Sequence, residues 1–117
     1  MRKIHVITQK EAVNEEKIKG CVAVVIDVFL ATSTIAFLLE KKYQPVYAVE
    51  DSESALKLAK ELEGPFVLLG ETKGESIEGF QYPDPCLIVP TEKEKTAIIC
   101  STNGTRTIKK AENAKVL

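Results

Sequence analysis

The stretch that decides the fold is residues 96–106, TAIICSTNGTR. Its first five residues are mostly apolar, which predicts a strand buried on both faces, as in a parallel sheet. Small hydroxyl-bearing residues and an Asn-Gly pair follow, and the pattern from residue 105 to residue 113 predicts a helix. A buried strand that turns directly into a helix is the repeating unit of a parallel α/β sheet.

Similar units precede this stretch. Further strands are predicted at residues 3–8, 21–27, 45–49 and 66–69, with a short edge strand at 87–89. Helices are predicted at residues 32–42, capped by Thr32 or Ser33, and at residues 51–62, capped by Asp51 or Ser52. Residues 11–19 predict a turn or two of helix, and residues 70–85 a long loop. This alternation predicts an α/β fold: a three-layer α/β/α arrangement with a mostly parallel, Rossmann-like sheet.

The length of 117 residues fits one domain, residues 1–117. Its last residues, 114–117, have the pattern of the first half of a strand. We therefore expect a truncated fold, the N-terminal half of a longer protein. An exposed sheet edge needs cover, so we also expect either a homo-oligomer or a missing C-terminal half to provide it.

Composition excludes several classes of function. The net charge of −1 gives no field that favours nucleic acid, and charged runs such as residues 92–95 predict solvated faces. No apolar run approaches the roughly 20 residues that span a bilayer, and the N-terminus lacks a leader-peptide pattern. The three cysteines, Cys21, Cys86 and Cys100, are far apart. They predict reduced thiols and a cytoplasmic location.

Polar residues follow three of the predicted strands. Asp27 ends one strand and precedes Thr32 and Ser33, and Glu71 with Lys73 follows another. The turn of residues 101–106 follows the third. Ligands bind at the carboxyl ends of the strands in open parallel sheets, so we expect the three groups to meet at one edge.

The turn after residue 100 predicts an anion site, most simply for phosphate. The free N–H groups and dipole of a helix N-terminus favour an anion, and a glycine permits close approach. Arg106 adds a charged fork suited to phosphate or sulfonate. The predicted catalytic residues are Asp27, Glu71 and Arg106. The predicted substrate-binding residues are Ser101, Thr102, Asn103, Gly104 and Thr105 of the turn, with Thr32, Ser33 and Lys73 from the other two groups. The alternative is an ordinary helix cap with Asn-Gly as a plain turn.

Asp27 and Glu71 together suit a Mg²⁺ ion that bridges the protein and phosphoryl oxygens, although each alone is compatible with a structural role. Asp27 is also a candidate phosphoryl-accepting nucleophile. A second mechanism stays open, because Cys100 to Arg106 spells Cys-x5-Arg, the spacing of thiol-dependent phosphatases. In the competing interpretation Cys100 is a small apolar residue that ends a strand.

Four motifs in order resemble one family. VVIDVFLATST, residues 24–34, resembles its VIDVLRATTT signature, and LGETKG, residues 69–74, resembles its GERGG loop. IEGF, residues 77–80, resembles its I-x-G-F, and STNGTR, residues 101–106, resembles its TTNGTR. The family is 2-phosphosulfolactate phosphatase, and the resemblance covers most of the chain.

The resemblance implies a Mg²⁺-dependent phosphatase that converts 2-phosphosulfolactate, a small anionic substrate, to sulfolactate and phosphate on the route to coenzyme M. It implies a metal site at Asp27 and Glu71 and a phosphate site at residues 103–106, in members considerably longer than this chain. The sequence departs from the family at Leu30 and Thr72, where the family has Arg, and Lys73 is the candidate replacement for the second. The sequence PDPC of residues 83–86 also replaces the family's GNSP. These departures keep a third hypothesis open, a non-catalytic phosphate- or sulfonate-binding fragment.

Overall fold

The computed structural model describes residues 2–93 and 95–117. Its elements are the 3-10 turn η1 (Lys10–Ala12), helices α1 (Ala31–Glu40), α2 (Ser52–Glu61) and α3 (Gly104–Ala111), and strands β1 (Val46–Val49), β2 (Phe66–Thr72), β3 (Glu75–Ser76) and β4 (Thr96–Cys100). Met1 and Glu94 lie outside the described residues. Met1 belongs to the N-terminus for which no leader peptide is expected, and Glu94 belongs to the charged run of residues 92–95.

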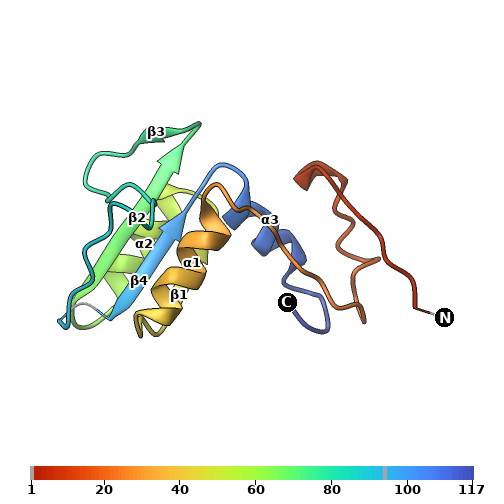
Figure 1. Ribbon diagram of the computed structural model, residues 1–117, viewed down its shortest axis with the longest axis horizontal. Coiled ribbons are helices and arrows are strands. Elements are labelled where there is room, and N and C mark those ends of the chain that lie inside the picture. The colour runs from red at the N-terminus through yellow and green to blue at the C-terminus, as the bar shows by residue number, and fades with distance from the viewer. Residues whose placement is uncertain (1, 94) are drawn as a thin grey trace.

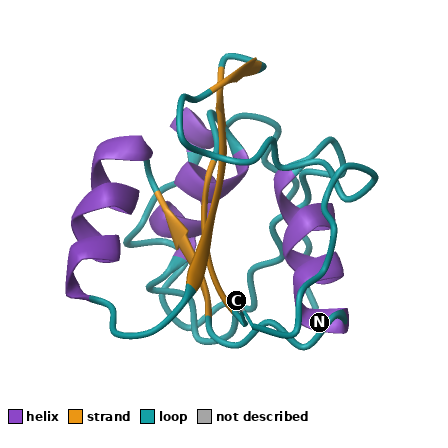
Figure 2. Ribbon diagram, turned by 90° about the vertical axis from the view of Figure 1, so that its left-hand side faces the viewer, coloured by secondary structure: helices purple, strands orange, loops and turns teal. Residues whose placement is uncertain are grey.

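The strands form one sheet in the described part of the chain, in the order β1-β4-β2-β3. β4 is parallel to both β1 and β2, and the short β3 is antiparallel to β2. Figures 1 and 2 show α2 on one face of this sheet and α1 on the other, with α3 beside α1 near β1. The predicted α/β fold with a mostly parallel sheet between helices is therefore confirmed.

The core follows the two-residue period of the central strand. Ala97 and Ile99 of β4 join Leu38 of α1 and Val67 and Leu69 of β2 in one buried cluster. Ile98, between them, is fully buried on the opposite face, where α2 packs against β4. The apolar residues Ala97–Cys100 of this strand are thus buried on both of its faces, as the sequence predicts.

Helices α2 and α3 lie close to the positions predicted for them, at residues 51–62 and 105–113. Asp51 caps α2 by accepting a hydrogen bond from the Ser54 amide at 2.8 Å, as the sequence predicts. The prediction for α1 is wrong at its start: the N-cap position is Leu30, with no side-chain cap, and the helix begins at Ala31. Thr32 instead exchanges hydrogen bonds with Asp27, as described below.

Three predicted strands are absent from the described residues. Residues 3–8 and 21–27 have no ladder, because the sheet ends at β1 and only an isolated bridge joins Val22 to Val116. Residues 85–87 form a turn, residues 88–89 have no regular structure, and the Asp84 carbonyl accepts amide hydrogen bonds from Leu87 and Ile88. The expected helix at residues 11–19 is reduced to η1 and turns. The expected loop at residues 70–85 begins as the end of β2 and includes β3.

The molecule is elongated, with principal extents of 47 × 28 × 27 Å. Figure 1 shows why: residues 2–28 (red to orange) lie away from the sheet, on the far side of α3. No helix in residues 2–93 and 95–117 is long and apolar enough to cross a membrane.

Candidate functional site

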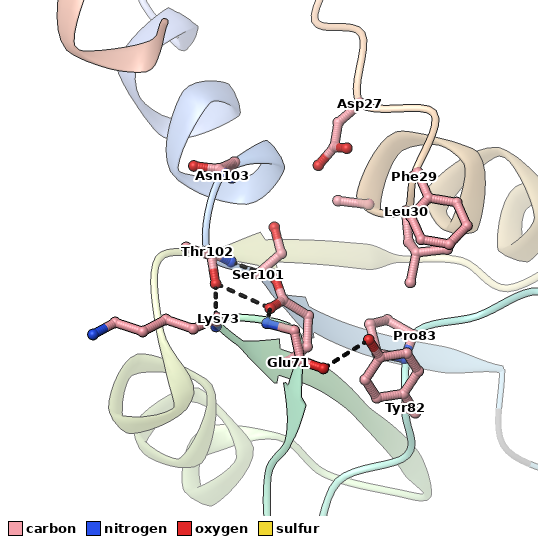
Figure 3. Close-up of a pocket in the computed structure, with 12 residues that line it drawn as sticks. Asp27, Phe29, Leu30, Glu71, Lys73, Tyr82, Pro83, Ser101, Thr102 and Asn103 are labelled. Carbon is pink, nitrogen blue, oxygen red and sulfur yellow. Dashed lines mark hydrogen bonds between the residues drawn. The ribbon is translucent and has the colours of Figure 1, made fainter.

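A cleft of about 230 Å³ opens where β2 and β4 end (Figure 3). The strand register explains its position, because Cys100 lies opposite Val49 on one side and Gly70 on the other. The residues that follow these ends therefore share one edge. The cleft is lined by Asp27, Glu71, Lys73, Ser101, Thr102 and Asn103, together with Phe29, Leu30, Ala31, Gly74, Tyr82 and Pro83. The three polar groups that the sequence placed after separate strands thus meet in one cleft.

The turn between β4 and α3 is held by its own hydroxyl groups. The Ser101 amide donates to Thr105 Oγ1 at 2.8 Å, and the Thr105 amide donates to Ser101 Oγ at 3.0 Å. Both residues are buried, and Thr105 does not line the cleft. This reciprocal pair satisfies the Thr105 amide in the first turn of the helix and the Ser101 amide before it, similar to the reciprocal bonds of a capping box. Ser101 and Thr105 therefore shape the turn.

Asn103 and Thr102 face outward from this turn. The amide of Asn103 donates to none of the described residues, which leaves it available to an anion at the start of α3. The backbone of Asn103 is in the right-handed helical region, so the strained geometry that an Asn-Gly pair allows is not used. The Thr102 amide, unlike that of Asn103, already donates a hydrogen bond, to Glu71.

Glu71 fastens the end of β2 to the turn. Its Oε1 accepts a hydrogen bond from the Thr102 amide at 2.6 Å. Its Oε2 accepts from Thr102 Oγ1 at 3.0 Å and from the Gly74 amide at 2.7 Å. Thr102 Oγ1 in turn accepts from the Lys73 amide at 2.6 Å, so that the loop after β2 and the turn after β4 form one hydrogen-bonded unit (Figure 3).

These contacts set the ionisation of Glu71. Burial acts to raise the pKa of its carboxyl group, but the amide hydrogen bonds from Thr102 and Gly74 and the Thr102 hydroxyl outweigh it. The positive charge of Arg106 acts in the same direction as these hydrogen bonds. The pKa of Glu71 is therefore held below its usual value of 4.5, and the side chain is a carboxylate at neutral pH.

Asp27 is positioned by the turn that leads into α1. Its amide donates to Thr32 Oγ1 at 2.7 Å, and the Thr32 amide donates back to the Asp27 carbonyl at 3.1 Å. Its carboxylate points toward Asn103 in Figure 3 and accepts no hydrogen bond from the described residues. A carboxylate at the cleft with no protein donor is free to meet a cation or a substrate.

The sequence predicts that Gly104 lets a ligand approach the turn closely. In the structure it instead makes room for Asp27 and Ala31. A Cβ atom at residue 104 would lie 2.5 Å from Asp27 Oδ2 and 2.5 Å from the Cβ of Ala31. The absence of a side chain therefore lets the start of α3 approach the start of α1. Gly104 is buried and does not itself line the cleft.

Lys10 is a site residue that the sequence interpretation missed. Its Nζ donates to Asn103 Oδ1 at 2.8 Å and pairs with Glu11 at 3.1 Å. A second cavity, of about 400 Å³, lies beside the first and is lined by Thr8, Gln9, Lys10, Glu11, Ile26, Asp27 and Asn103. Lys10 and Asn103 are 93 residues apart, and no local pattern around Lys10 indicates that contact.

Arg106 and Ser33 lie away from the cleft lining. Arg106 is exposed, and its Nε donates to the Glu50 carbonyl at 3.1 Å, beyond the end of β1. The guanidinium group therefore does not make the expected contact with the cleft, because α3 packs against β1 and its first turn directs this side chain there. Lys73 does line the cleft, with its amino group pointing away from Asp27 (Figure 3).

Cys100 has the wrong environment for a nucleophile. It is 1% exposed, and its Sγ fills the space beside Gly70. Burial, with the carboxylates of Asp51 and Glu71, raises the pKa of the thiol to about 11. A reactive cysteine needs a lowered pKa and access, so the structure favours the interpretation of Cys100 as a small apolar residue.

The residues present fit a magnesium ion held in part by the substrate. No cluster of three His, Cys, Asp or Glu side chains that could hold a metal occurs in the described residues. Mg²⁺, however, commonly takes one or two carboxylates and completes its shell with waters and substrate phosphate. The donor-free Asp27 carboxylate meets that need, and Glu71 Oε1, with one hydrogen bond, has a lone pair left.

Comparison with known proteins identifies what the chain resembles. Residues 7–117 match the family model of 2-phosphosulpholactate phosphatase. The chain is 41% identical over 115 residues to a probable 2-phosphosulfolactate phosphatase of Clostridium acetobutylicum, covering 97% of this chain and 49% of the relative. A probable 2-phosphosulfolactate phosphatase of Clostridium novyi is 37% identical over 115 residues, with the same coverage. The chain thus spans about half the length of these curated relatives.

Proposed function

The chain belongs to the 2-phosphosulfolactate phosphatase family, and we propose that it carries the phosphoryl-binding part of an enzyme that hydrolyses 2-phosphosulfolactate, or a related small anionic phosphate monoester, with Mg²⁺. The products would be sulfolactate and phosphate. The observation that supports this most is the cleft in which the Asp27 carboxylate, the Glu71-held turn and the start of α3 converge.

Phosphate would bind at the start of α3. The Asn103 amide is directed by a turn that Ser101 and Thr105 hold in place, so that it does not need to reorganise when the anion arrives. The Glu71 contacts keep the loop carrying Lys73 against this turn. Pre-set donors of this kind stabilise charge that accumulates on phosphoryl oxygens.

Two lysines flank this phosphate position. Lys73 lines the first cavity and Lys10 the second, and Asn103 lines both. Leu30, which stands where the family has Arg, lines the first cavity and offers it no charge. We assign to Lys73 and Lys10 the positive charge that a substrate with more than one acidic group requires.

Asp27 would hold the metal, with Glu71 as a second ligand through Oε1. When bound, Mg²⁺ would neutralise charge on the phosphoryl oxygens and orient the attacking water. Asp27 suits this role because Thr32 fixes its backbone while its carboxylate has no donor among the described residues.

A second candidate function is binding without turnover. The loss of the Arg at residue 30 and the coverage of only half of each relative favour a phosphate- or sulfonate-binding module. The two candidates share the anion site and differ only in hydrolysis, so one set of measurements separates them.

The test is phosphate release from 2-phosphosulfolactate, measured with Mg²⁺, with chelator, and after Mg²⁺ is restored. We expect turnover that the chelator abolishes and Mg²⁺ recovers. Asp27→Asn removes the charged ligand and should lower kcat/KM by about a hundredfold or more. Asp51→Asn is the matched control, because Asn is an equally good helix cap and Asp51 lies outside the cleft.

Calorimetric titration with inorganic phosphate or vanadate completes the test. Binding without turnover under any metal condition would support the non-catalytic module. Turnover that resists the chelator and survives Asp27→Asn would contradict the proposed metal site.

A further inference from the structure

Residues 22–28 have the side-chain pattern of a strand although no sheet contains them. Val22, Val24, Ile26 and Val28 are 68%, 76%, 76% and 70% exposed, and the residues between them are partly buried. This is the two-residue period of an extended chain with one face in water. In Figure 1 this 22–28 segment (orange) leads back to α1, apart from the four-stranded sheet.

The C-terminal residues have begun to pair with this segment. Val22 and Val116 form a parallel bridge, in which the Ala23 amide donates to the Val116 carbonyl at 2.8 Å. The Lys115 amide donates to the Cys21 carbonyl at 2.9 Å. At this bridge the two stretches run in the same direction and share a register, whereas Ala114, two residues earlier, is bridged antiparallel to Lys19.

That register can be extended along the 22–28 segment. Val24 would stand opposite the first residue after Leu117, and Ile26 opposite the third. The N–H and C=O groups of Val25 face this side, and neither makes a backbone hydrogen bond within the described residues. The extension ends at Asp27, whose amide is already bonded to Thr32 Oγ1.

We propose that the 22–28 segment is the docking edge for a parallel strand supplied by the polypeptide that continues from the Leu117 position in longer family members. The curated relatives have the length for it, since the chain matches 49% of each. The direction and register of residues 115–116 favour this occupant over a second copy, because the continuing backbone starts in place. A strand edge with free donors beside an apolar face is the surface that such pairing requires.

Pairing would also complete the candidate site. Asp27 ends the segment, so a strand along residues 23–26 would fix the backbone on its N-terminal side as Thr32 fixes it on the other. This consequence rests on the proposed function, whereas the pairing itself does not. The experiment below therefore measures amide exchange and is independent of turnover.

The test compares this chain with a version extended at Leu117 by the stretch of about ten residues that follows the matched segment in the Clostridium acetobutylicum relative. Hydrogen exchange of ¹⁵N-valine amides is followed, with ¹⁵N-isoleucine amides of β4 as the folding control. We expect the Val25 amide to exchange at least about tenfold more slowly in the extended chain, as for a new ladder hydrogen bond. A scrambled extension of the same composition should give no protection.

Two variants of the extended chain sharpen the result. Val24→Lys removes the β-branched side chain that would stand opposite the first added residue and should reduce the protection by up to about fivefold, whereas Val89→Lys changes a side chain that is 78% exposed elsewhere and should leave the protection unchanged. Unchanged Val25 exchange with β4 protected would overturn the proposal. Protection that appears in the unextended chain and rises with its concentration would overturn it as well, because the occupant would then be a second copy.

Discussion

Residues 22–40 and residues 96–111 carry the same kind of sequence, an apolar run followed by a turn and a helix, with small hydroxyl residues near the start of the helix. In the second region the apolar run is β4, paired on both sides and covered on both faces. In the first the run is extended, bridged at one residue and largely in water. Both nevertheless deliver a polar group to the same cleft, Asp27 from one and Asn103 from the other.

The difference teaches that an apolar, β-branched run predicts the need for neighbours rather than their presence. β4 has β1 and β2 to accept its backbone hydrogen bonds and α1 and α2 to cover its side chains. The 22–28 segment has only the bridge to Val116. The turns that follow the runs are local, and both form regardless of how the run itself is paired.

The largest expected effect comes from the same truncation made in the two runs. Ile98→Ala removes a fully buried side chain between β4 and α2 and should lower the free energy of unfolding by about 3 kcal/mol. Ile26→Ala removes a side chain that is 76% exposed and should change it by less than about 0.5 kcal/mol. Urea unfolding of both variants measures this. Equal losses would show that the 22–28 segment is buried in solution.

The next effect tests the point where the two regions touch. Gly104→Ala places a Cβ against Ala31 and Asp27, so the starts of α1 and α3 must separate. We expect the free energy of unfolding to fall by about 2 kcal/mol. Urea unfolding again gives the value. The double variant Ala31→Gly/Gly104→Ala removes one of the clashing atoms and should recover part of the loss as a positive coupling energy. Additive losses would mean that the two helix starts are not in contact.

The same contrast explains what the sequence could predict. β4, α2 with its Asp51 cap, and the meeting of Asp27, Glu71 and the 101–106 turn at one edge were predictable, because they follow from local periodicity and from parallel topology. The strand at residues 21–27 was not correctly predicted, because its formation depends on a partner that periodicity does not reveal. Its turn contact between Asp27 and Thr32 replaces the expected helix cap.

The details of the site that were missed are long-range or orientational. Lys10 reaches Asn103 across 93 residues of sequence, and Arg106 turns toward the Glu50 carbonyl instead of the cleft. A motif specifies which residues share a turn, but the packing of α3 against β1 decides where each side chain points. The metal and substrate assignments stay predictions, which the phosphate-release experiment tests.

A smaller effect concerns the link that holds the turn of the second region. Glu71→Gln weakens hydrogen bonds to a charged acceptor and should cost about 1 kcal/mol at neutral pH. Because the pKa of Glu71 is lowered on folding, its contribution is complete above the usual value of 4.5 and is lost as pH falls through the lower folded-state pKa.

Urea unfolding of wild type and Glu71→Gln across this range measures the difference between them. The gap should close as the pH falls below the folded-state pKa of Glu71. A gap that persists unchanged in acid would show that the Glu71 charge does not hold the turn.

The smallest effect concerns two cysteines at the ends of the two apolar runs: Cys21 directly before residues 22–28, and Cys100 as the last residue of β4. Cys21 is exposed, whereas Cys100 is buried at the end of β4 with a pKa raised by burial from 9.0 to about 11. That shift lowers its thiolate fraction by about a hundredfold, before its inaccessibility is considered.

Iodoacetamide should therefore label Cys21 and Cys86 in the folded chain and leave Cys100 unmodified, with all three labelled in denaturant. Peptide mass mapping reads the sites directly. Rapid labelling of Cys100 in the folded chain, with loss of turnover, would reinstate the thiol mechanism. It would also show that the end of β4 is as open to solvent as the unpaired 22–28 segment.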